Sequence, residues 1–431
     1  MIEIAPLLRG GVVRVPPSKS ASVRALLADG LAGGGSRLHG LSVCQDALSA
    51  KKLAQGLLQR HSDSPLGKPS TSTLSNLLDC GESALSLHLA AAIAALQPFP
   101  TGFTARGSLL SRPLVSLCRA LSAFGVQTGP PEAGFPFTVK GPLRPARVQM
   151  DGRSGSQALS GLLMALPLLE GASEILLEQP TSLPYIFMTI DLLQAFGIEI
   201  LVENEGPNYR YVIPGKQRYY PAEMQIPGDW SAGALWLVAA AIRKCTRSHG
   251  ASLPELYVDG LDAPGPSAPD SMILDVLQSV GLACQQEPSG WTVQPGSVLR
   301  PLHFDLRQAP DLAPPLAALA AYLPGRSQLS GIHRLFGKES NRALALQEML
   351  ERMGIRIALE EDRLWIEGGF EKEGPPCYVD ACGDHRIAMA LAVAATGMQR
   401  RVVLEGEDCV AKSYPEFWKT FQGLANPRSL V

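Results

Sequence analysis

The chain has 431 residues, of which 46% are hydrophobic and 18% are charged, a composition typical of a soluble globular protein with a large core. Its 38 basic and 40 acidic residues leave a net charge of −2, which argues against a general nucleic-acid-binding surface. No apolar run reaches the roughly 18 residues of a membrane-spanning helix, so no membrane partner is expected. The length favours about two to three domains.

Eight cysteines are scattered along the chain, without the Cys-x-x-Cys or Cys/His spacing of zinc sites. In a chain of this length they are typical of reduced thiols in a cytoplasmic protein. Residues 1–11 lack a basic start followed by an apolar stretch, so no secretory signal is expected. The sequence therefore predicts a cytoplasmic protein without a metal centre.

The first segment that carries chemistry is Val15-Pro-Pro-Ser-Lys-Ser-Ala-Ser-Val-Arg24. Its two prolines disfavour helix before Ser18, and an Ala/Leu-rich helix is predicted to follow. Lys19, Ser20 and Arg24 then gather at the positive end of a helix dipole, which favours a phosphate or a carboxylate. An ordinary capped helix with two solvated cations remains an alternative at this point.

Ala/Leu-rich helices that follow short polar clusters recur along the chain. They are predicted to begin near Ser20, Ser83, Ser156, Ser231, Leu312 and His385. Their spacing of 63 to 81 residues is long enough for a complete supersecondary unit. A second series of helices ends just before Gly125, Gly197, Gly281 and Gly354, and glycine suits the left-handed position after a helix. With short β-branched strands between the helices, each unit is mixed α/β.

Six such units favour two lobes of three, because single cores stop growing near about 250–300 residues. A lobe boundary is expected near Ile226, after strand-like segments at 209–213 and 219–220. The Pro/Ser-rich residues 61–73 are expected to form a surface insertion.

If the polar helix starts face one cleft, they supply groups for anion binding and acid–base chemistry. The cations are Lys19, Arg24, Arg112, Arg342, Arg386 and Lys412, and the carboxylates are Asp311, Glu339 and Asp384. Simpler interpretations exist for two of these groups. The spacing of Glu339 and Arg342 favours an i,i+3 surface pair. Asp311 follows a proline and precedes an apolar helix, so it is an ordinary N-cap candidate.

Short motifs in one fixed order give the sequence a specific resemblance. They are Pro17-Ser-Lys-Ser20 with Arg24, Ser154-Gly-Ser-Gln157, Pro184-Tyr185, Pro310-Asp311, Lys338-Glu-Ser-Asn-Arg342, Asp384-His-Arg386-Ile-Ala-Met and Lys412-Ser-Tyr-Pro415. From about residue 8 to about residue 423, the chain resembles the 5-enolpyruvylshikimate-3-phosphate (EPSP) synthases. Its variants at 80–83, 229–231 and 310–315 resemble a divergent bacterial branch of that family.

The resemblance implies the two-lobed α/β fold of the enolpyruvyl transferases, an inside-out α/β barrel with three βαβαββ units in each lobe. It implies a discontinuous lobe of residues 1–15 plus 227–431, an inserted lobe of residues 16–226, and an active site in the cleft between them. The implied reaction transfers the enolpyruvyl group of phosphoenolpyruvate to the 5-hydroxyl of shikimate 3-phosphate and releases phosphate, through a tetrahedral ketal. This step belongs to the shikimate pathway of aromatic amino acid biosynthesis, and no metal or organic cofactor is implied.

The same motifs imply the site residues. The resemblance assigns shikimate 3-phosphate to Lys19, Ser20, Arg24, Ser154, Ser156, Gln157, Ser182, Tyr185, Asp311 and Lys338. It assigns phosphoenolpyruvate to Lys19, Ala84, Arg112, Gln157, Arg342, Arg386 and Lys412. Asp311 would accept the proton of the attacking hydroxyl. Glu339, together with Lys19, would deliver a proton to the methylene carbon of phosphoenolpyruvate and later remove one.

Four positions depart from the usual family pattern. Asn, Gly and Arg usually stand in place of Glu82, Ala84 and His88, and Asp commonly stands in place of Asn341, beside Arg342. Glu82 is unfavourable near an anion unless it points away or pairs with a cation, and His88 lacks the permanent charge of arginine. Ala84 adds a methyl group to the expected phosphoenolpyruvate site. That addition predicts tolerance of glyphosate, the family's inhibitor, which is longer than the substrate. The alternative is that Ala84 only packs at the helix start, displaced from the pocket by the change at Glu82.

Two other functions fit the sequence less well. The related UDP-N-acetylglucosamine enolpyruvyl transferases use a cysteine in a loop, whereas residues 108–113 here contain Arg112 and no cysteine. A catalytically silent, ligand-binding member of the family would need none of Lys19, Asp311, Glu339 and Arg386. The resulting prediction is a monomeric cytoplasmic enzyme with two small-molecule substrates and no nucleic-acid or membrane partner.

Overall fold

A computed structural model of the chain describes residues 1–4, 8–62, 77–246, 254–296 and 298–424. It divides into two compact units, each of which has its own hydrophobic core. Unit 1 comprises Met1–Pro16 and Pro227–Val431, and unit 2 comprises Pro17–Ile226. The lobe boundaries expected from the sequence differ from this division by one residue, and the expected cleft stays a prediction. Of the insertion expected at 61–73, residues 63–73 lie outside the described part of the chain.

One strand topology recurs in the described residues. In unit 2, β4 (Leu78–Asp79) pairs in parallel with β5 (Pro100–Thr104), β5 pairs antiparallel with β7 (Phe137–Lys140), and β6 (Gln127–Thr128) pairs antiparallel with β7. Three other sheets repeat this order of one parallel and two antiparallel pairings. The second sheet of unit 2 contains β8 (Arg147–Asp151), β9 (Ser173–Glu178), β11 (Asn208–Ile213) and β10 (Leu201–Glu205). One sheet of unit 1 contains β2 (Gly11–Arg14), β13 (Leu256–Asp259), β15 (Gly290–Pro295) and β14 (Leu282–Glu287). Another sheet of unit 1 contains β16 (His303–Asp305), β17 (Arg326–Ser330), β19 (Arg363–Glu367) and β18 (Ile357–Glu360).

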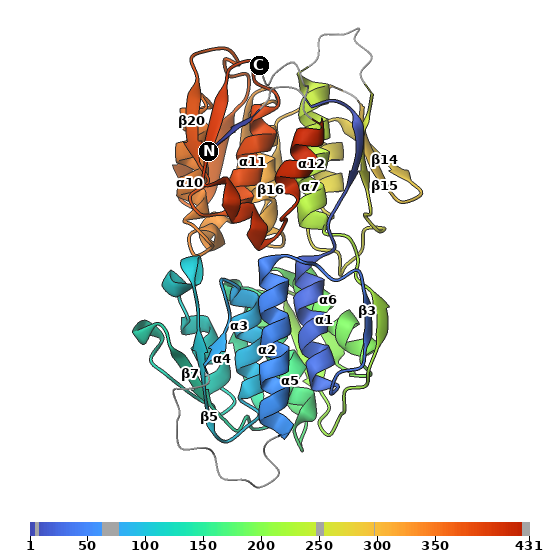
Figure 1. Cartoon of the computed structure of the whole chain (residues 1–431), viewed down its shortest axis with the longest axis vertical. Coiled ribbons are helices and arrows are strands. Elements are labelled where there is room, and N and C mark those ends of the chain that lie inside the picture. The colour runs from blue at the N-terminus through green and yellow to red at the C-terminus, as the bar shows by residue number, and fades with distance from the viewer. Residues whose placement is uncertain (5–7, 63–76, 247–253, 297, 425–431) are drawn as a thin grey trace. The chain divides into compact units, whose positions relative to one another are not determined.

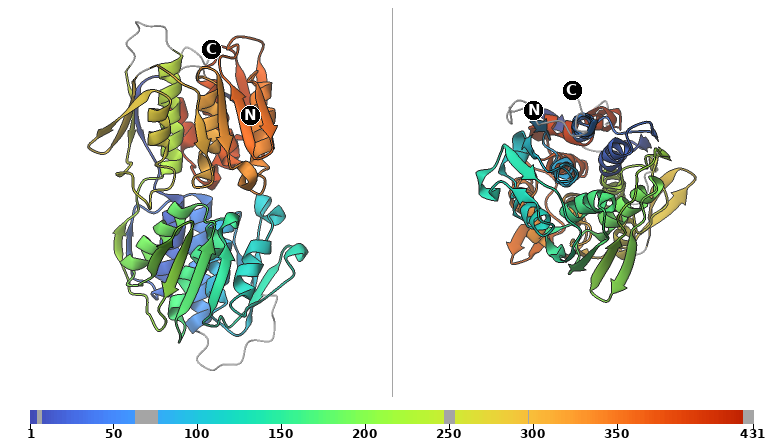
Figure 2. Two further views of the ribbon diagram at one scale, coloured as in Figure 1. Left: turned by 180° about the vertical axis from the view of Figure 1, so that it is seen from behind. Right: turned by 90° about the horizontal axis from the view of Figure 1, so that it is seen from below.

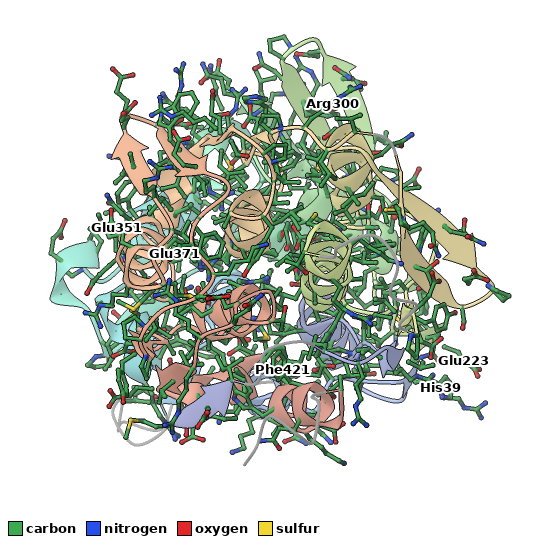
Figure 3. The ribbon with its side chains drawn as sticks, turned by 90° about the horizontal axis from the view of Figure 1, so that it is seen from above. His39, Glu223, Arg300, Glu351, Glu371 and Phe421 are labelled. Carbon is green, nitrogen blue, oxygen red and sulfur yellow. The ribbon has the colours of Figure 1, made fainter. Side chains whose placement is uncertain are left out.

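Two further sheets are shorter versions of the same arrangement. In unit 1, β20 (Cys377–Asp380) pairs in parallel with β21 (Val402–Glu405), and β1 (Ile2–Ile4) joins β21 antiparallel, so the N-terminal strand lies among the last elements of the chain (Figure 1). In unit 2, β3 (Arg37–His39) pairs in parallel with β12 (Glu223–Gln225). Figure 3 shows His39 and Glu223 side by side, with the ring Nε2 3.4 Å from the carboxylate Oε1.

The predicted helix starts are confirmed to within one residue. The helices are α1 (Lys19–Leu31), α3 (Ala84–Ala94), α5 (Gln157–Ala165), α7 (Trp230–Cys245), α9 (Ala313–Ala320) and α11 (His385–Ala395). Ser18, Ser83, Asp229 and Asp384 each cap one of them by accepting a hydrogen bond from a backbone N–H of the first turn. The polar clusters therefore fix where the helices begin.

The second series of helices is confirmed as well. It consists of α4 (Val115–Ser122), α6 (Leu183–Ala195), α8 (Ile273–Ser279) and α10 (Arg342–Arg352). The glycines that follow, Gly125, Gly197, Gly281 and Gly354, have φ angles of +81°, +81°, +95° and +78°, as the left-handed position after a helix requires. Two more helices, α2 (Gln45–Ser62) and α12 (Phe417–Leu424), stand outside both series. The strand expected at 219–220 is wrong: these residues form no strand, and the buried Tyr219 hydroxyl donates to the carbonyl of Met164 at 2.7 Å.

The Ala-rich helices lie in the centre of each unit. In unit 1, α7, α9 and α11 pack against one another, and in unit 2, α3 packs against both α1 and α5. Seen from behind, the strands β8 to β11 cover the helices of unit 2 (Figure 2). Small side chains let such buried helices approach closely, which explains their composition. None of the described helices combines the length and the apolar character needed to cross a bilayer.

Candidate functional site

In unit 1, charged side chains from several helix starts meet in one buried group, here called the carboxylate–cation cluster. Asp311 lies in the 3-10 turn η5 (Pro310–Leu312) before α9, and Arg342 is the first residue of α10. Asp384 caps α11. The complete cluster is Asp311, Lys338, Glu339, Arg342, Asp384, Arg386 and Lys412.

Arg342 is the centre of this cluster and is 0% exposed. Its guanidinium donates to Asp384 Oδ2 at 2.9 Å, to Asp311 Oδ1 at 3.0 Å and to Glu339 Oε2 at 2.7 Å. Burial alone would lower the pKa of Arg342, but the three carboxylates raise it above its usual value. The surface i,i+3 interpretation of Glu339 and Arg342 is therefore wrong, because Asp384 and Asp311, distant in sequence, cover and pair the guanidinium.

Asp311 contacts three cations. Its Oδ1 lies 3.1 Å from Lys338 Nζ as well as 3.0 Å from Arg342 Nη1, and its Oδ2 lies 3.1 Å from Arg386 Nη2. Burial alone would raise the pKa of Asp311, but these cations hold it well below its usual value. The N-cap interpretation is wrong, because Leu312 occupies the cap position of α9, which has no side-chain cap bond.

Lys338 and Glu339 precede α10 in an irregular turn. Burial lowers the pKa of Lys338 to about 8, although Asp311 opposes this shift. Glu339 Oε1 lies 3.8 Å from Lys412 Nζ, while its Oε2 accepts from Arg342. An anion that competes for these two cations would release the Glu339 carboxylate, so the cluster can bind anions and hold acid–base groups at the same place.

Asp270 is a buried carboxyl beside this cluster that sequence analysis missed. It is 0% exposed, and its carboxylate accepts a hydrogen bond from the hydroxyl of Ser231, near the start of α7. Burial, followed by the charge of Asp311, raises the pKa of Asp270 to about 6, although Arg386 opposes the shift. Its sequence context, a proline-rich loop, contains no signal for such a role.

In unit 2, Arg24 is a buried cation, 1% exposed, among neutral acceptors. It donates to Thr189 Oγ1 at 2.7 Å, to the Ser20 carbonyl at 2.9 Å and to the Tyr185 carbonyl at 3.3 Å. Burial lowers the pKa of Arg24 to about 10, which leaves it charged near pH 7. The structure thus brings together Ser20, Arg24 and Tyr185, three of the predicted residues, and a buried charge held by neutral groups favours an anion. Sequence analysis missed the hydroxyl of Thr189, whose only signal is a polar residue within an apolar helix.

Two other segments of unit 2 that were predicted to belong to the site, around Ser154 and around Ser182, are joined by a hydrogen bond. Ser154 is exposed in the 3-10 turn η3 (Gly152–Ser154), whereas Ser156, just before α5, is buried. Ser182 precedes α6, is buried, and has a left-handed φ of +56°. Thr181, its neighbour, donates from its hydroxyl to the Gly152 carbonyl at 2.8 Å. Gln157 is the first residue of α5 and is partly exposed beside this junction.

Lys19, the first residue of α1, forms an ion pair with Asp46, whose Oδ2 lies 3.1 Å from Nζ. Asp46 belongs to the first turn of α2 and was not predicted. An acidic residue in a first helical turn is usually assigned to the helix dipole, so sequence alone could not identify its partner.

Three of the positions that depart from the family pattern lie around the start of α3, and the fourth, Asn341, caps α10. Glu82 Oε2 accepts hydrogen bonds from the backbone N–H and the hydroxyl of Ser108, at 3.1 and 3.2 Å. Ala84 is buried at the first position of α3. His88 is 7% exposed, and its Nδ1 donates to the Ala84 carbonyl at 2.8 Å. Burial, together with the charge of Arg112, lowers the pKa of His88 to about 4, so the ring is neutral near pH 7.

Arg112 itself follows the 3-10 helix η1 (Gly107–Ser111).

Within the described residues, no three His, Cys, Asp or Glu side chains are grouped so as to hold a metal ion.

Comparisons with known proteins match one family along almost the whole chain. The model of the family "EPSP synthase (3-phosphoshikimate 1-carboxyvinyltransferase)" matches residues 6–421. Relatives named 3-phosphoshikimate 1-carboxyvinyltransferase include those of Dehalococcoides mccartyi, 32% identical over 98% of both chains, and of Methanocorpusculum labreanum, 31% identical over 96% of both chains.

Solved structures show the same fold. An EPSP synthase from Acinetobacter baumannii has a TM-score of 0.74 at 23% identity and covers 98% of both chains. The enolpyruvyl transferase NikO from Streptomyces tendae has a TM-score of 0.71 at 18% identity and covers 98% of this chain and 96% of its own. The fold is therefore the α/β fold of the enolpyruvyl transferases, as the repeated sheets indicate. With the family model matched over nearly its full length, the chain belongs to the EPSP synthase (3-phosphoshikimate 1-carboxyvinyltransferase) family.

Proposed function

We propose that this protein transfers the enolpyruvyl group of phosphoenolpyruvate to the 5-hydroxyl of shikimate 3-phosphate and releases phosphate. Family membership supports the reaction. The observation that carries it is the carboxylate–cation cluster, in which the partly buried carboxylates of Asp311 and Glu339 pair with cations that an anionic substrate could also bind.

Shikimate 3-phosphate is proposed to bind chiefly to residues of unit 2. The buried charge of Arg24, held by neutral acceptors, supports a phosphate ligand there. The full proposed set is Lys19, Ser20, Arg24, Ser154, Ser156, Gln157, Ser182, Tyr185, Asp311 and Lys338. Phosphoenolpyruvate is proposed to bind Lys19, Ala84, Arg112, Gln157, Arg342, Arg386 and Lys412.

Asp311 is the proposed base that accepts the proton of the 5-hydroxyl. Its low pKa makes it a weak base while three cations contact it. The carboxylate and phosphate of phosphoenolpyruvate would draw Arg342 and Arg386 toward themselves. The pKa of Asp311 would then rise, because part of its stabilising charge is redirected. Asp311 is therefore a stronger base when phosphoenolpyruvate is bound.

Glu339, with Lys19, is proposed to manage the proton at the methylene carbon. Addition forms a bond between the 5-oxygen and C2 of phosphoenolpyruvate, while C3 gains a proton. In the second step the bond between C2 and the phosphate oxygen breaks, and C3 loses a proton to restore the double bond. A positioned acid or base contributes typically about 10²–10⁴-fold to such a transfer.

The test is phosphate release, measured with both substrates together and with each alone. Wild-type protein should release phosphate only with both. Glu339→Gln should keep the affinity for both substrates while turnover falls about 10²-fold or more. Glu348→Gln, on the exposed face of α10, is the matched control and should behave as wild type. Absence of release by wild-type protein would refute the function, and near-normal turnover of Glu339→Gln would refute only the assignment of that residue.

A further inference from the structure

Two segments of unit 2 that are distant in sequence are joined beside Arg112. The backbone N–H of Cys80 donates to the Thr104 carbonyl at 2.9 Å, and that of Arg106 donates to the Gly81 carbonyl at 2.8 Å. These bonds lay the segment before α3 along the segment that leads into residues 107–112, here called the Arg112 loop.

The side chain of Glu82 connects the segment before α3 to the Arg112 loop. Its Oε2 accepts from both the backbone N–H and the hydroxyl of Ser108. Gly107 lies directly against the same carboxylate: a Cβ at this position would be closer to the Glu82 carboxyl group than real Cβ atoms come, and its φ is +50°. The loop therefore requires glycine at 107 for two reasons, its backbone conformation and the approach of Glu82.

The loop also has an apolar attachment to the core. Leu109 is fully buried in the core of unit 2, whereas Leu110 is 53% exposed. The backbone N–H of Arg112 donates to the Leu109 carbonyl at 3.2 Å, so the position of Arg112 follows from that of the short helix η1. Leu109 anchors this helix on its apolar side, and Glu82 anchors its first turn on the polar side.

The neighbouring His88 is neutral near pH 7, so it adds no positive charge to that of Arg112. We propose that Glu82 is a positioning residue: by binding Ser108 and packing on Gly107, it holds the Arg112 loop and so determines the affinity for phosphoenolpyruvate. This inference rests on the proposed function, in which Arg112 binds that substrate. It explains why a carboxylate is tolerated beside an anion site, since Glu82 acts here as a hydrogen-bond acceptor for the loop.

The experiment compares Glu82→Ala with Glu82→Gln, because glutamine keeps an acceptor oxygen and removes the charge. Glu82→Ala should raise the KM for phosphoenolpyruvate about tenfold, with kcat reduced less than about threefold and the Kd for shikimate 3-phosphate unchanged. Glu82→Gln should restore the KM to within about threefold of wild type. The Kd is measured by calorimetry, and the melting temperature of each variant establishes that it folds.

An independent variant keeps the test valid if Glu82→Ala folds poorly. Gly107→Ala should raise the KM for phosphoenolpyruvate in the same way, because its methyl group displaces the Glu82 carboxylate. Gly134→Ala is the matched control: Gly134 also has a positive φ, of +68°, but a Cβ there meets nothing within 4 Å, so the KM should not change.

An unchanged KM in a folded Glu82→Ala variant would overturn the inference, and if that variant does not fold, an unchanged KM in Gly107→Ala would overturn it. So would equal effects of the alanine and glutamine variants, since the charge would then matter and the acceptor would not. Both results presuppose an active wild-type enzyme. Failure of the inference is thus distinguishable from failure of the proposed function, which would appear as absence of phosphate release by the wild type.

Discussion

Asp270 is a single residue whose ionisation should affect the stability of the fold. Its pKa of about 6 lies above the usual 3.8, so the folded state binds a proton more tightly than the unfolded state. The resulting stabilisation is fully present below about pH 4 and is lost as the pH rises through about 6. The groups around it are Asp311, Arg386, Asp229 and the Ser231 hydroxyl.

Asp270→Asn should therefore change the pH dependence of stability. Asparagine tolerates the φ of +65° at this position and keeps an oxygen for the Ser231 hydroxyl. Above about pH 6 the variant should be more stable than wild type by about 1–3 kcal/mol, and below about pH 4 this advantage should vanish. Melting temperatures across this range check the prediction. A difference that stays constant with pH would contradict it.

Ala84 is a second single residue for which we make a prediction, here on inhibition by glyphosate. Its carbonyl is held by the His88 ring, so the backbone at the start of α3 cannot easily shift to make room for a longer ligand. Ala84→Gly should therefore increase inhibition by glyphosate, by about ten- to a hundredfold if the methyl group costs about 1–3 kcal/mol of overpacking. The inhibition constant against phosphoenolpyruvate is the measurement. Ala90→Gly, deeper in α3, controls for loss of helix stability and should leave inhibition unchanged. If both variants behave alike, Ala84 does not limit the inhibitor.

At the scale of elements, the contact between α3 and α5 depends on one glycine. A Cβ at Gly161 would lie 2.6 Å from the His88 carbonyl oxygen and 3.1 Å from the Ala92 Cβ. The first of these neighbours is backbone, so the two helices would have to move apart. Gly161→Ala should destabilise the protein by about 1–3 kcal/mol, as measured by thermal unfolding.

Gly423→Ala is the control for this prediction. Gly423 lies in α12, where a Cβ meets nothing within 4 Å, so alanine should be neutral or stabilising by up to about 1 kcal/mol. Equal effects of the two variants would show that the spacing of α3 and α5 is not set by Gly161.

At the scale of the whole molecule, the residues proposed to bind shikimate 3-phosphate belong to both units. Lys338 and Asp311 are in unit 1, and the others are in unit 2. If both units bind one dianion, it relieves the repulsion between their cations. Small-angle scattering should then give a smaller radius of gyration with shikimate 3-phosphate than without it. Shikimate, which lacks the phosphate, should cause a smaller change. An unchanged radius of gyration at saturation with shikimate 3-phosphate would contradict this prediction.

Much of the architecture is encoded locally and could be predicted from the sequence. Capping residues such as Ser18 and Asp229 fix helix starts through hydrogen bonds within one turn. Gly197 and Gly354 end helices through their own backbone conformation. Because these interactions span a few residues, their pattern is visible in the sequence and reveals the repeat. The order of the motifs, spread over the chain, was sufficient to indicate the family.

The pairing of charges was decided only by the tertiary structure. The spacing of Glu339 and Arg342 favoured a surface pair, yet Asp384, 42 residues further along, shares the same buried guanidinium. The bonds between Glu82 and Ser108, between Lys19 and Asp46, and between Ser231 and Asp270 likewise join segments 26 to 39 residues apart. Burial, which decides whether such a charge is solvated, is a property of elements packed from distant parts of the chain. For that reason the sequence determined the family and the repeat and supplied the residues proposed to react, and the tertiary structure alone decided which charged residues contact one another.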